Sequence, residues 1–227
     1  MEAGTNVFPD HTFTTDDRPS SSNSTASRDH LATQIAAAGG GADWMSYQEG
    51  ISDETGRCPI EGAGFYRPRH NPFVFFQDVV GAPPSKDSPD CIAHHRDFSA
   101  LASDLASGRV ARYNFITPDL CHDMHGDSAC PAGSNRRRAG DDWLAANLPP
   151  LIQFVEAQGG VIFLLWEEGD ATATLPFLAI GPGVKPGYAG AVPYSHSSLL
   201  KTVEQILDLP ILPTVAGAND LGDLFLP

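Results

Sequence analysis

The sequence predicts an α/β sandwich with a mainly parallel sheet. Two unbroken apolar runs, residues 160–166 (GVIFLLW) and 175–180 (LPFLAI), are typical of strands that are buried on both faces. Segments with apolar residues at helical spacing precede and follow these runs. Such a mixture of helices and continuously apolar strands indicates a parallel sheet that is covered by helices.

The amino-terminal part begins with a polar arm at residues 1–28, which has no hydrophobic periodicity. A short helix follows and ends at Gly39, and residues 42–48 are predicted to form a strand. Residues 50–96 are rich in turn-forming residues and are expected to be irregular. Residues 97–108 carry apolar side chains at positions i, i+3 and i+7, which predicts a helix.

The carboxyl-terminal part is more regular. Residues 110–116 are predicted to form a strand, followed by a long polar loop at 117–140 and a helix at 141–157. The Pro149-Pro150 pair is expected to break or restart that helix, because proline is tolerated only in a first helical turn. After the two apolar strands, residues 197–208 return to helical spacing. Residues 29–227 are therefore expected to form one domain.

Composition excludes several classes of protein. The chain has 227 residues, a length that suits one ample domain, and a formal charge of −14. This charge disfavours binding to nucleic acid or to anionic membranes. The longest strongly apolar run, Val161 to Trp166, is far too short to cross a membrane. No signal peptide is expected at Met1, so the chain is either cytoplasmic or the mature form of an exported protein.

The four cysteines allow three pairings. All four lie in segments rich in Pro, Gly and Asp rather than in apolar runs, which favours disulfides over buried thiols. The pairing of neighbours, Cys58–Cys91 with Cys121–Cys130, closes the two shortest loops. Four reduced thiols in a cytosolic protein remain the alternative.

Polar side chains gather where the predicted strands end, which is the edge at which open α/β sheets bind ligands. They are Asp119, His122, Asp123 and His125 after residues 110–116, Glu167 and Glu168 after residues 160–166, and His196 before the last helix.

These carboxylates and imidazoles are the ligand types that Mg²⁺, Mn²⁺, Ca²⁺ or Zn²⁺ require, and neighbouring carboxylates repel each other unless a cation is present. The pattern therefore predicts a site for a divalent metal ion. Each residue also has a structural alternative. Asp119 and Asp123 can form Asx turns, Glu167 and Glu168 can begin a solvated loop, and His196 can belong to a helix cap.

Five segments in order carry a family resemblance: YNFITPDLCHDMHGDSAC, GDDWLAANLPPLI, GGVIFLLWEEGD, LPFLAIGPGVKPGY and PYSHSSLLKTVEQIL. Over about residues 29–224 the chain resembles the bacterial phosphoesterase family, which includes acid phosphatases and phospholipase C-type enzymes of the alkaline phosphatase superfamily. The resemblance implies an α/β/α sandwich and hydrolysis of a phosphate ester, soluble or on a phospholipid headgroup, at a metal site. It also implies a secreted or periplasmic protein, in line with the cysteines.

The resemblance also implies roles for individual residues. Glu167-Glu168 match the acidic pair that binds the metal, usually Asp-Glu, and Asp119 and Asp123 join them as expected ligands. The expected catalytic imidazoles are those of His125, then His122, and His196. The upstream segment YRPRHNPFVFF supplies the expected substrate-binding residues, which are Arg69, His70 and Asn71.

One departure from the family is large, because its nucleophilic Ser or Thr follows a first apolar strand. Asn6, Thr14, Thr15 and Ser20–Ser22 lie in the polar arm without such a strand, so none is expected to be an activated nucleophile. The chain is thus expected to be an amino-terminally truncated family member in which water, its pKa lowered by the cation, attacks directly.

A missing central strand leaves unpaired edges, so oligomerisation or replacement of that strand is predicted. Two alternative functions stay open. The first is a catalytically impaired remnant that acts as a binding or oligomeric protein, and the second is a relative of the sulfatases or phosphomutases.

Overall fold

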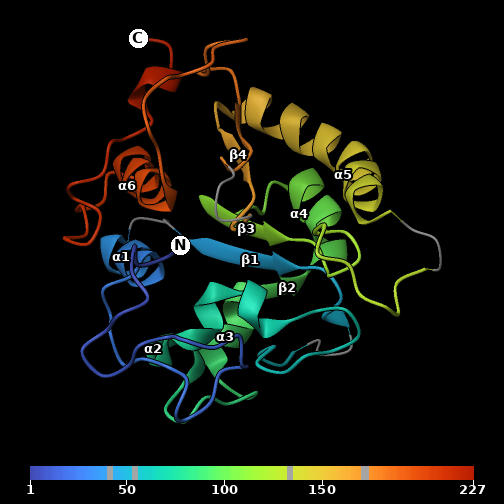
Figure 1. The fold of residues 1–227 in the computed structure, drawn as a ribbon, viewed down its shortest axis with the longest axis vertical. Coiled ribbons are helices and arrows are strands. Elements are labelled where there is room, and N and C mark those ends of the chain that lie inside the picture. Colours follow the sequence, from blue (N-terminus) through green and yellow to red (C-terminus); the bar gives the residue numbers. More distant parts are fainter. Residues whose placement is uncertain (40–42, 53–55, 132–134, 170–173) are drawn as a thin grey trace.

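The computed structural model describes residues 1–39, 43–52, 56–131, 135–169 and 174–227. Its main sheet has three parallel strands in the order β2-β1-β3, namely β2 (His95–Asp97), β1 (Trp44–Gln48) and β3 (Tyr113–Thr117). Figure 1 shows this sheet in the middle of the molecule, with helices around it. The predicted α/β class with a mainly parallel sheet is confirmed at this level, and the likeness to alkaline phosphatase stays a prediction.

Helices cover both faces of the central strand. Trp44 and Tyr47, three positions apart on β1, point to opposite faces of the sheet, as the pleat requires. Trp44 stacks on Phe73, while the hydroxyl of Tyr47 donates a 2.8 Å hydrogen bond to Asp104. The helices are α1 (Leu31–Ala38), α2 (Gln77–Val80), α3 (Pro89–His94), α4 (Leu101–Ser107), α5 (Arg136–Gln158) and α6 (His196–Ile206), with 3₁₀ helices η2 (Pro68–His70), η3 (Pro72–Phe75), η4 (Phe98–Ala100) and η5 (Gly222–Leu224).

The expectation that residues 50–96 are irregular is wrong in part. This segment contains α2, α3, η2, η3 and the start of β2. These elements are three to six residues long, which is too short for a hydrophobic period to be visible in the sequence.

The two apolar runs do form strands, β4 (Ile162–Leu165) and β5 (Phe177–Ile180), but they do not join the parallel sheet. They pair with each other in antiparallel orientation, with Ile162 opposite Ile180. Neither strand is fully buried, and Leu178 is 54% exposed. The prediction of two parallel strands is therefore wrong for this pair. The segment 166–176 between them is too short for the crossover that parallel neighbours need.

Helix α5 is longer than predicted, because it begins at Arg136 rather than at residue 141. The side chain of Asn135 caps it by accepting hydrogen bonds from the backbone N–H groups of Arg137 and Arg138. The break expected at Pro149-Pro150 is wrong, since the helix continues through both exposed prolines. The predicted loop 117–140 is shortened accordingly.

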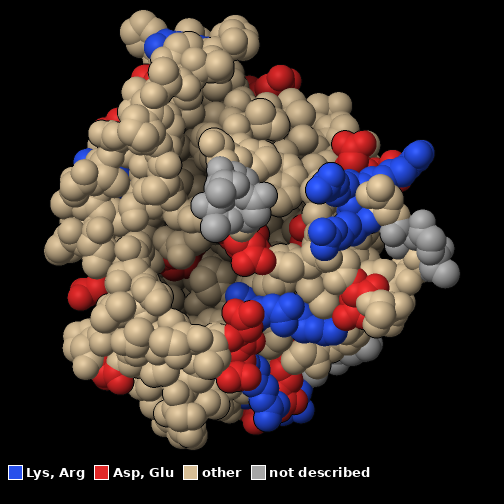
Figure 2. All heavy atoms as spheres, viewed as in Figure 1, with Lys and Arg blue, Asp and Glu red and all other residues tan. Residues whose placement is uncertain are grey.

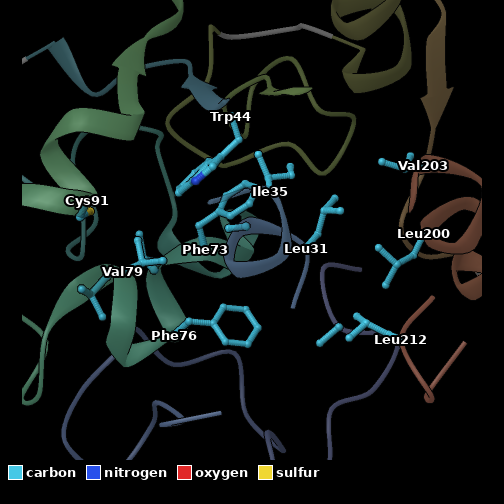
Figure 3. Close-up of a cluster of buried hydrophobic side chains, with 14 of the residues drawn as sticks. Leu31, Ile35, Trp44, Phe73, Phe76, Val79, Cys91, Leu200, Val203 and Leu212 are labelled. Carbon is cyan, nitrogen blue, oxygen red and sulfur yellow. The ribbon is translucent and has the colours of Figure 1, made fainter. Parts of the chain in front are cut away.

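The core lies between the main sheet, α1 and the segment around α2, and α6 closes it from the other side (Figure 3). Phe73 is its centre, with no exposed surface, and its ring meets Trp44 at 4.3 Å and Phe115 at 5.4 Å between centroids. Burial of one large apolar side chain of this kind contributes about 1.5–3 kcal/mol. The core therefore holds β1 and β3, whose carboxyl ends carry polar residues, in a rigid register.

The arm at residues 1–28 packs against this core. Ala3 and Phe8 belong to the buried cluster, and Thr25 forms backbone hydrogen bonds with Phe75 and Gln77. The division of the chain at residue 28 stays a prediction.

Both expected disulfides are present, Cys58–Cys91 and Cys121–Cys130. The first joins the turn-rich segment to α3, and the second closes the polar loop after β3. Among the residues that the structure describes, none of the helices has the length and apolar character needed to cross a membrane.

Candidate active site

The candidate site begins where two neighbouring parallel strands end. Glu49 directly follows β1 and Asp119 lies two residues after β3, so the two residues meet at the same edge of the sheet. The backbone N–H of Asp119 donates a 2.9 Å hydrogen bond to Oε2 of Glu49. The backbone N–H of Glu49 in turn donates to the carbonyl of Thr117 at 3.0 Å.

The loop after β3 is built from three successive Asx turns. The side chains of Asp119, Asp123 and Asp127 each accept a hydrogen bond from the backbone N–H two residues further on, at 2.8–2.9 Å. The structural alternative considered for Asp119 and Asp123 is thus realised. These turns use one oxygen of each aspartate and leave the second free to contact other segments.

The second oxygens of Asp123 and Asp127 join the loop to the segment 67–70. Oδ2 of Asp123 lies 3.1 Å from Nδ1 of His70, and Oδ2 of Asp127 lies 3.6 Å from a guanidinium nitrogen of Arg67. The Cys121–Cys130 disulfide closes the same loop. The position of the loop is therefore fixed by three contacts: the two ion pairs with the segment 67–70 and the disulfide.

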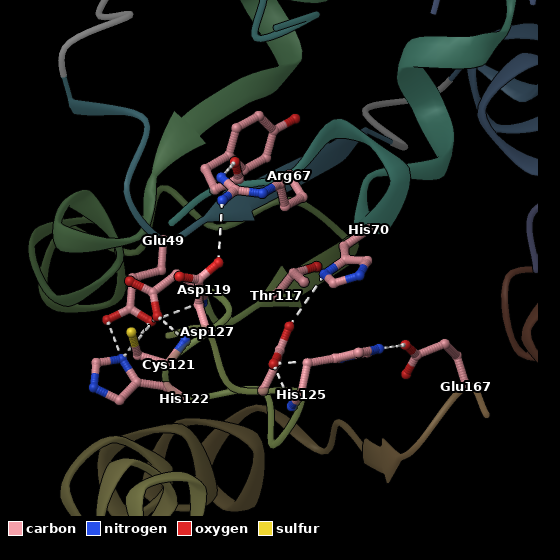
Figure 4. Close-up of polar contacts among 12 residues, drawn as sticks. Glu49, Arg67, His70, Thr117, Asp119, Cys121, His122, His125, Asp127 and Glu167 are labelled. Atoms are coloured by element: carbon pink, nitrogen blue, oxygen red, sulfur yellow. Dashed lines mark hydrogen bonds and ion pairs between the residues drawn. The ribbon is translucent and has the colours of Figure 1, made fainter. Parts of the chain in front are cut away.

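The first group of candidate residues combines two sets that share His125, one with His70 and Asp123 and the other with Glu167 and Glu168 (Figure 4). Nε2 of His125 lies 2.9 Å from Oε1 of Glu168 and 3.9 Å from Oε1 of Glu167. Nδ1 of the same ring lies 3.4 Å from Asp123, and the ring stacks on that of His70 with 4.7 Å between centroids. His125 thus connects the loop after β3 with the residues after β4.

The carboxylate of Asp123 is kept ionised by its surroundings. Burial alone would raise the pKa of Asp123, but hydrogen bonds from His70 and from the backbone N–H of His125, together with the charge of both imidazoles, outweigh burial and lower it. A carboxylate that stays negative can orient both imidazole rings, and it can also contribute an oxygen to a cation.

The second group consists of Glu49, Asp119 and His122. Nδ1 of His122 lies 3.1 and 3.0 Å from the two carboxylate oxygens of Glu49 and 3.3 Å from Asp119. Burial and the neighbouring charge of Glu49 raise the pKa of Asp119. Sequence analysis grouped Asp119 and His122 with Asp123 and His125, but Figure 4 shows the two groups apart, with Glu49, Asp119 and His122 at the left of the view and His70, His125 and Glu167 at the right.

The other predicted site residues lie as follows. His196 begins α6, and its Nε2 is 3.4 Å from the carbonyl oxygen of Trp166, which places it beside the residues that follow β4. Asn71 is fully buried and donates a 3.1 Å hydrogen bond to the hydroxyl of Tyr66. Arg69 is exposed. Within the described residues, neither Asn71 nor Arg69 has a polar contact with either group.

Sequence analysis overlooked Glu49 and Arg67. Glu49 could have been found, because it directly follows the predicted strand 42–48 and therefore lies at the same edge as Asp119. Arg67 carries no such signal, because its role depends on the long-range contact with Asp127.

Figure 2 shows a hollow near the middle of the face viewed, with acidic side chains at its rim and basic groups to one side. Fold and site together define an α/β protein with carboxylates and imidazoles gathered at the carboxyl ends of its strands. The chain belongs to the Phosphoesterase family, whose family model matches residues 12–210.

Several curated proteins are similar to the chain. A phosphatidylinositol-3-phosphatase of Mycobacterium tuberculosis is 26% identical over 165 residues, which cover 72% of this chain and 48% of that protein. A phosphate-repressible acid phosphatase of Penicillium chrysogenum is 25% identical over 74% of this chain and 40% of its own length. A probable acid phosphatase of Kluyveromyces lactis is 26% identical over 81% of this chain and 46% of its length. The chain thus spans about half the length of these relatives or less.

Proposed function

We propose that the protein hydrolyses phosphate esters at a divalent metal ion held by the first group, with Glu168 and Glu167 as its main ligands and Asp123 as a further one. The observation that carries this proposal is the 2.9 Å contact between His125 and Glu168, which brings two segments 43 residues apart to one point. Family membership and the names of the similar phosphatases support the same reaction class.

The residues present fit a divalent cation. The group offers carboxylate oxygens and imidazole nitrogens, which suit Mg²⁺, Mn²⁺ or Zn²⁺ and, with more oxygen ligands, Ca²⁺. Glu167 and Glu168 are 52% and 71% exposed at their side chains, so a cation and a substrate can reach them. Both carboxylates lie near Nε2 of His125, and within the described part of the chain neither forms an ion pair with Lys or Arg. A bound cation would supply the positive charge that the phosphate oxygens need.

The imidazoles supply proton transfer in this proposal. Asp123 contacts the backbone N–H and the Nδ1 atom of His125. The Nε2 atom of His125 is therefore left to face Glu168, one of the proposed metal ligands. From this position Nε2 of His125 can donate a proton to the oxygen of the leaving group. His70 stacks on His125 and restricts its ring. Water is the attacking group, and His196 borders the same site.

The substrate class in this proposal is a small phosphate ester, soluble or on a phospholipid headgroup. Two disulfides also favour an oxidising compartment, outside the cell or in the periplasm, because such bonds rarely persist in the cytosol.

The first test compares hydrolysis of p-nitrophenyl phosphate and of bis-p-nitrophenyl phosphate, with and without a chelator and after Mg²⁺, Mn²⁺, Ca²⁺ or Zn²⁺ is restored. We expect the chelator to abolish turnover and one of these ions to restore it. The Glu168→Gln variant should lower kcat/KM by at least about tenfold, since weakened support of a metal commonly has effects of 10–100-fold.

The matched control is Glu156→Gln, which removes an exposed carboxylate from α5 and should leave kcat/KM unchanged. If the pure protein shows no chelator-sensitive turnover, the proposal is wrong. If metal content and activity are the same in Glu168→Gln and in the original protein, the alternative of a non-catalytic binding protein is favoured.

A further inference from the structure

The carboxylate of Glu49 touches none of the residues of the first group in the described contacts, yet it holds the loop that carries two of them. It accepts hydrogen bonds from the backbone N–H of Asp119 at 2.9 Å and from Nδ1 of His122 at 3.0–3.1 Å. Its side chain is 22% exposed, and charge-assisted hydrogen bonds of this kind are the strong ones.

Glu49 stands on a rigid support. It follows the central strand β1, and its backbone N–H continues the hydrogen-bond ladder by donating to Thr117 of β3. The preceding side chain, Gln48, is 1% exposed and donates to the hydroxyls of Ser46 and Thr117. The carboxylate thus extends from a backbone position that is fixed by the sheet, and its hydrogen bonds tie the loop after β3 to that position.

A continuous series of hydrogen bonds leads from Glu49 to the first group. Asp119, held by Glu49, accepts at its carbonyl from the backbone N–H of Asp123 at 2.8 Å. Asp123 then accepts from the backbone N–H of His125 at 2.8 Å, and His125 meets Glu168 at 2.9 Å. The links are a strand-end contact at Glu49, a main-chain turn from Asp119 to Asp123, an Asx turn at Asp123 and the contact of His125 with Glu168, so a shift at Asp119 is passed on to the ring of His125.

We propose that Glu49 is a positioning residue for the phosphate-ester hydrolysis inferred above: through Asp119 and His122 it sets the place of His125 opposite Glu168. This inference rests on the proposed function. In it, His122 acts as an anchor of the loop, since its Nδ1 is occupied by Glu49 and Asp119.

The test uses Glu49→Gln and Glu49→Ala. Glutamine has the size of glutamate but only one acceptor oxygen, whereas the carboxylate of Glu49 has two oxygens for the backbone N–H of Asp119 and Nδ1 of His122. Alanine has no acceptor at this position. We expect kcat to fall about tenfold in Glu49→Gln and further in Glu49→Ala, with KM within about twofold. The loss stays below the hundredfold that a 1 Å misplacement of a reacting group can cause. Glu61→Gln is the control, because Glu61 also accepts from cationic side chains, Arg18 and Lys86, and should leave kcat unchanged.

A double-mutant cycle separates positioning from general damage to the fold. If Glu49 acts through His125, then Glu49→Gln should cause no further loss of kcat in a His125→Ala background. An unchanged kcat in Glu49→Ala would overturn the proposal, and so would a loss from Glu49→Gln that persists in full without His125.

Hydrogen exchange keeps this test independent of the proposed function. Glu49→Gln should speed the exchange of the backbone N–H groups of Asp119, Asp123 and His125, while those of β1 and β3 stay protected. If the original protein has no activity, the proposed hydrolysis fails but exchange still tests the anchor. Unchanged exchange across the loop would overturn the positioning role whether or not the protein is an enzyme.

Discussion

The eight histidines of this chain differ in burial: some lie in the core and others lie at the open edge of the sheet. His30 is fully buried, stacks on Phe76 and contacts Asp78, while His95 is 7% exposed and its Nδ1 lies 2.8 Å from the carbonyl of Cys91. His125, by contrast, lies at the open edge of the sheet between two carboxylates. Buried histidines of the first kind connect segments of the core.

His95 provides a test of the effect of burial. Burial is the main cause that lowers the pKa of His95 from 6.5 to about 4, so its folded form resists protonation. The unfolded chain therefore binds the proton first as the pH falls. Stability that is present above pH 6.5 should be lost progressively down to about pH 4, by on the order of 3 kcal/mol.

The measurement is urea unfolding at several pH values between 7.5 and 4 for the original protein and for His95→Asn. Asparagine keeps an N–H donor for the carbonyl of Cys91 but does not titrate. We expect a smaller loss of unfolding free energy with falling pH in the variant. Equal pH dependence in the two proteins would contradict the role given to His95.

Helix α5 packs against the loop of the candidate site at a glycine, Gly140. Gly140 is buried, and a Cβ atom there would lie 2.7 Å from two side-chain carbons of Met124 and 2.8 Å from the carbonyl oxygen of His122. Met124 itself adopts a positive φ of 74°, so this part of the loop is already tightly constrained. Helix α5 thus packs closely, at Gly140, against His122 and Met124, which belong to the loop that carries candidate residues of both groups.

We therefore expect Gly140→Ala to lower stability and activity, although alanine in place of glycine ordinarily stabilises a helix by about 1 kcal/mol. The added methyl group should cost about 1–3 kcal/mol by overpacking and should displace the loop. Thermal unfolding and kcat/KM measure the two effects.

Gly183→Ala is the control, since among the described residues no atom outside Gly183 and its two chain neighbours lies within 4 Å of the added Cβ at that position. It should change stability by no more than about 0.5 kcal/mol. A Gly140→Ala variant that is more stable than the original protein would show that the loop does not pack on α5 as described.

In the described part of the molecule four strands have an open edge: β2 and β3 at the two ends of the main sheet, and β4 and β5 in the antiparallel pair. Within the described residues, β3 pairs only with β1, and β4 pairs only with β5. The side chains of β3 and β4 are half-buried throughout. Open edges with partly exposed apolar side chains favour pairing with another chain, so the prediction of self-association stands.

Size-exclusion chromatography with light scattering over a range of protein concentrations measures this property. We expect a mass above the 24.2 kDa of one chain at high concentration. A single species of 24.2 kDa at every concentration would contradict the prediction of self-association.

Sequence patterns located β1, β3, β4, β5 and the four longer helices, the neighbour pairing of the cysteines and most of the polar residues at the strand ends. These features can be predicted from local sequence, because apolar periodicity and the ends of strands depend on residues that are close together in the chain. The tertiary structure alone decided that β4 and β5 are antiparallel, that Asn71 is buried, and that Glu49 meets His122 across 73 positions. Such contacts depend on how distant segments pack, because a side chain at a strand end can meet any segment that the fold brings to the same edge.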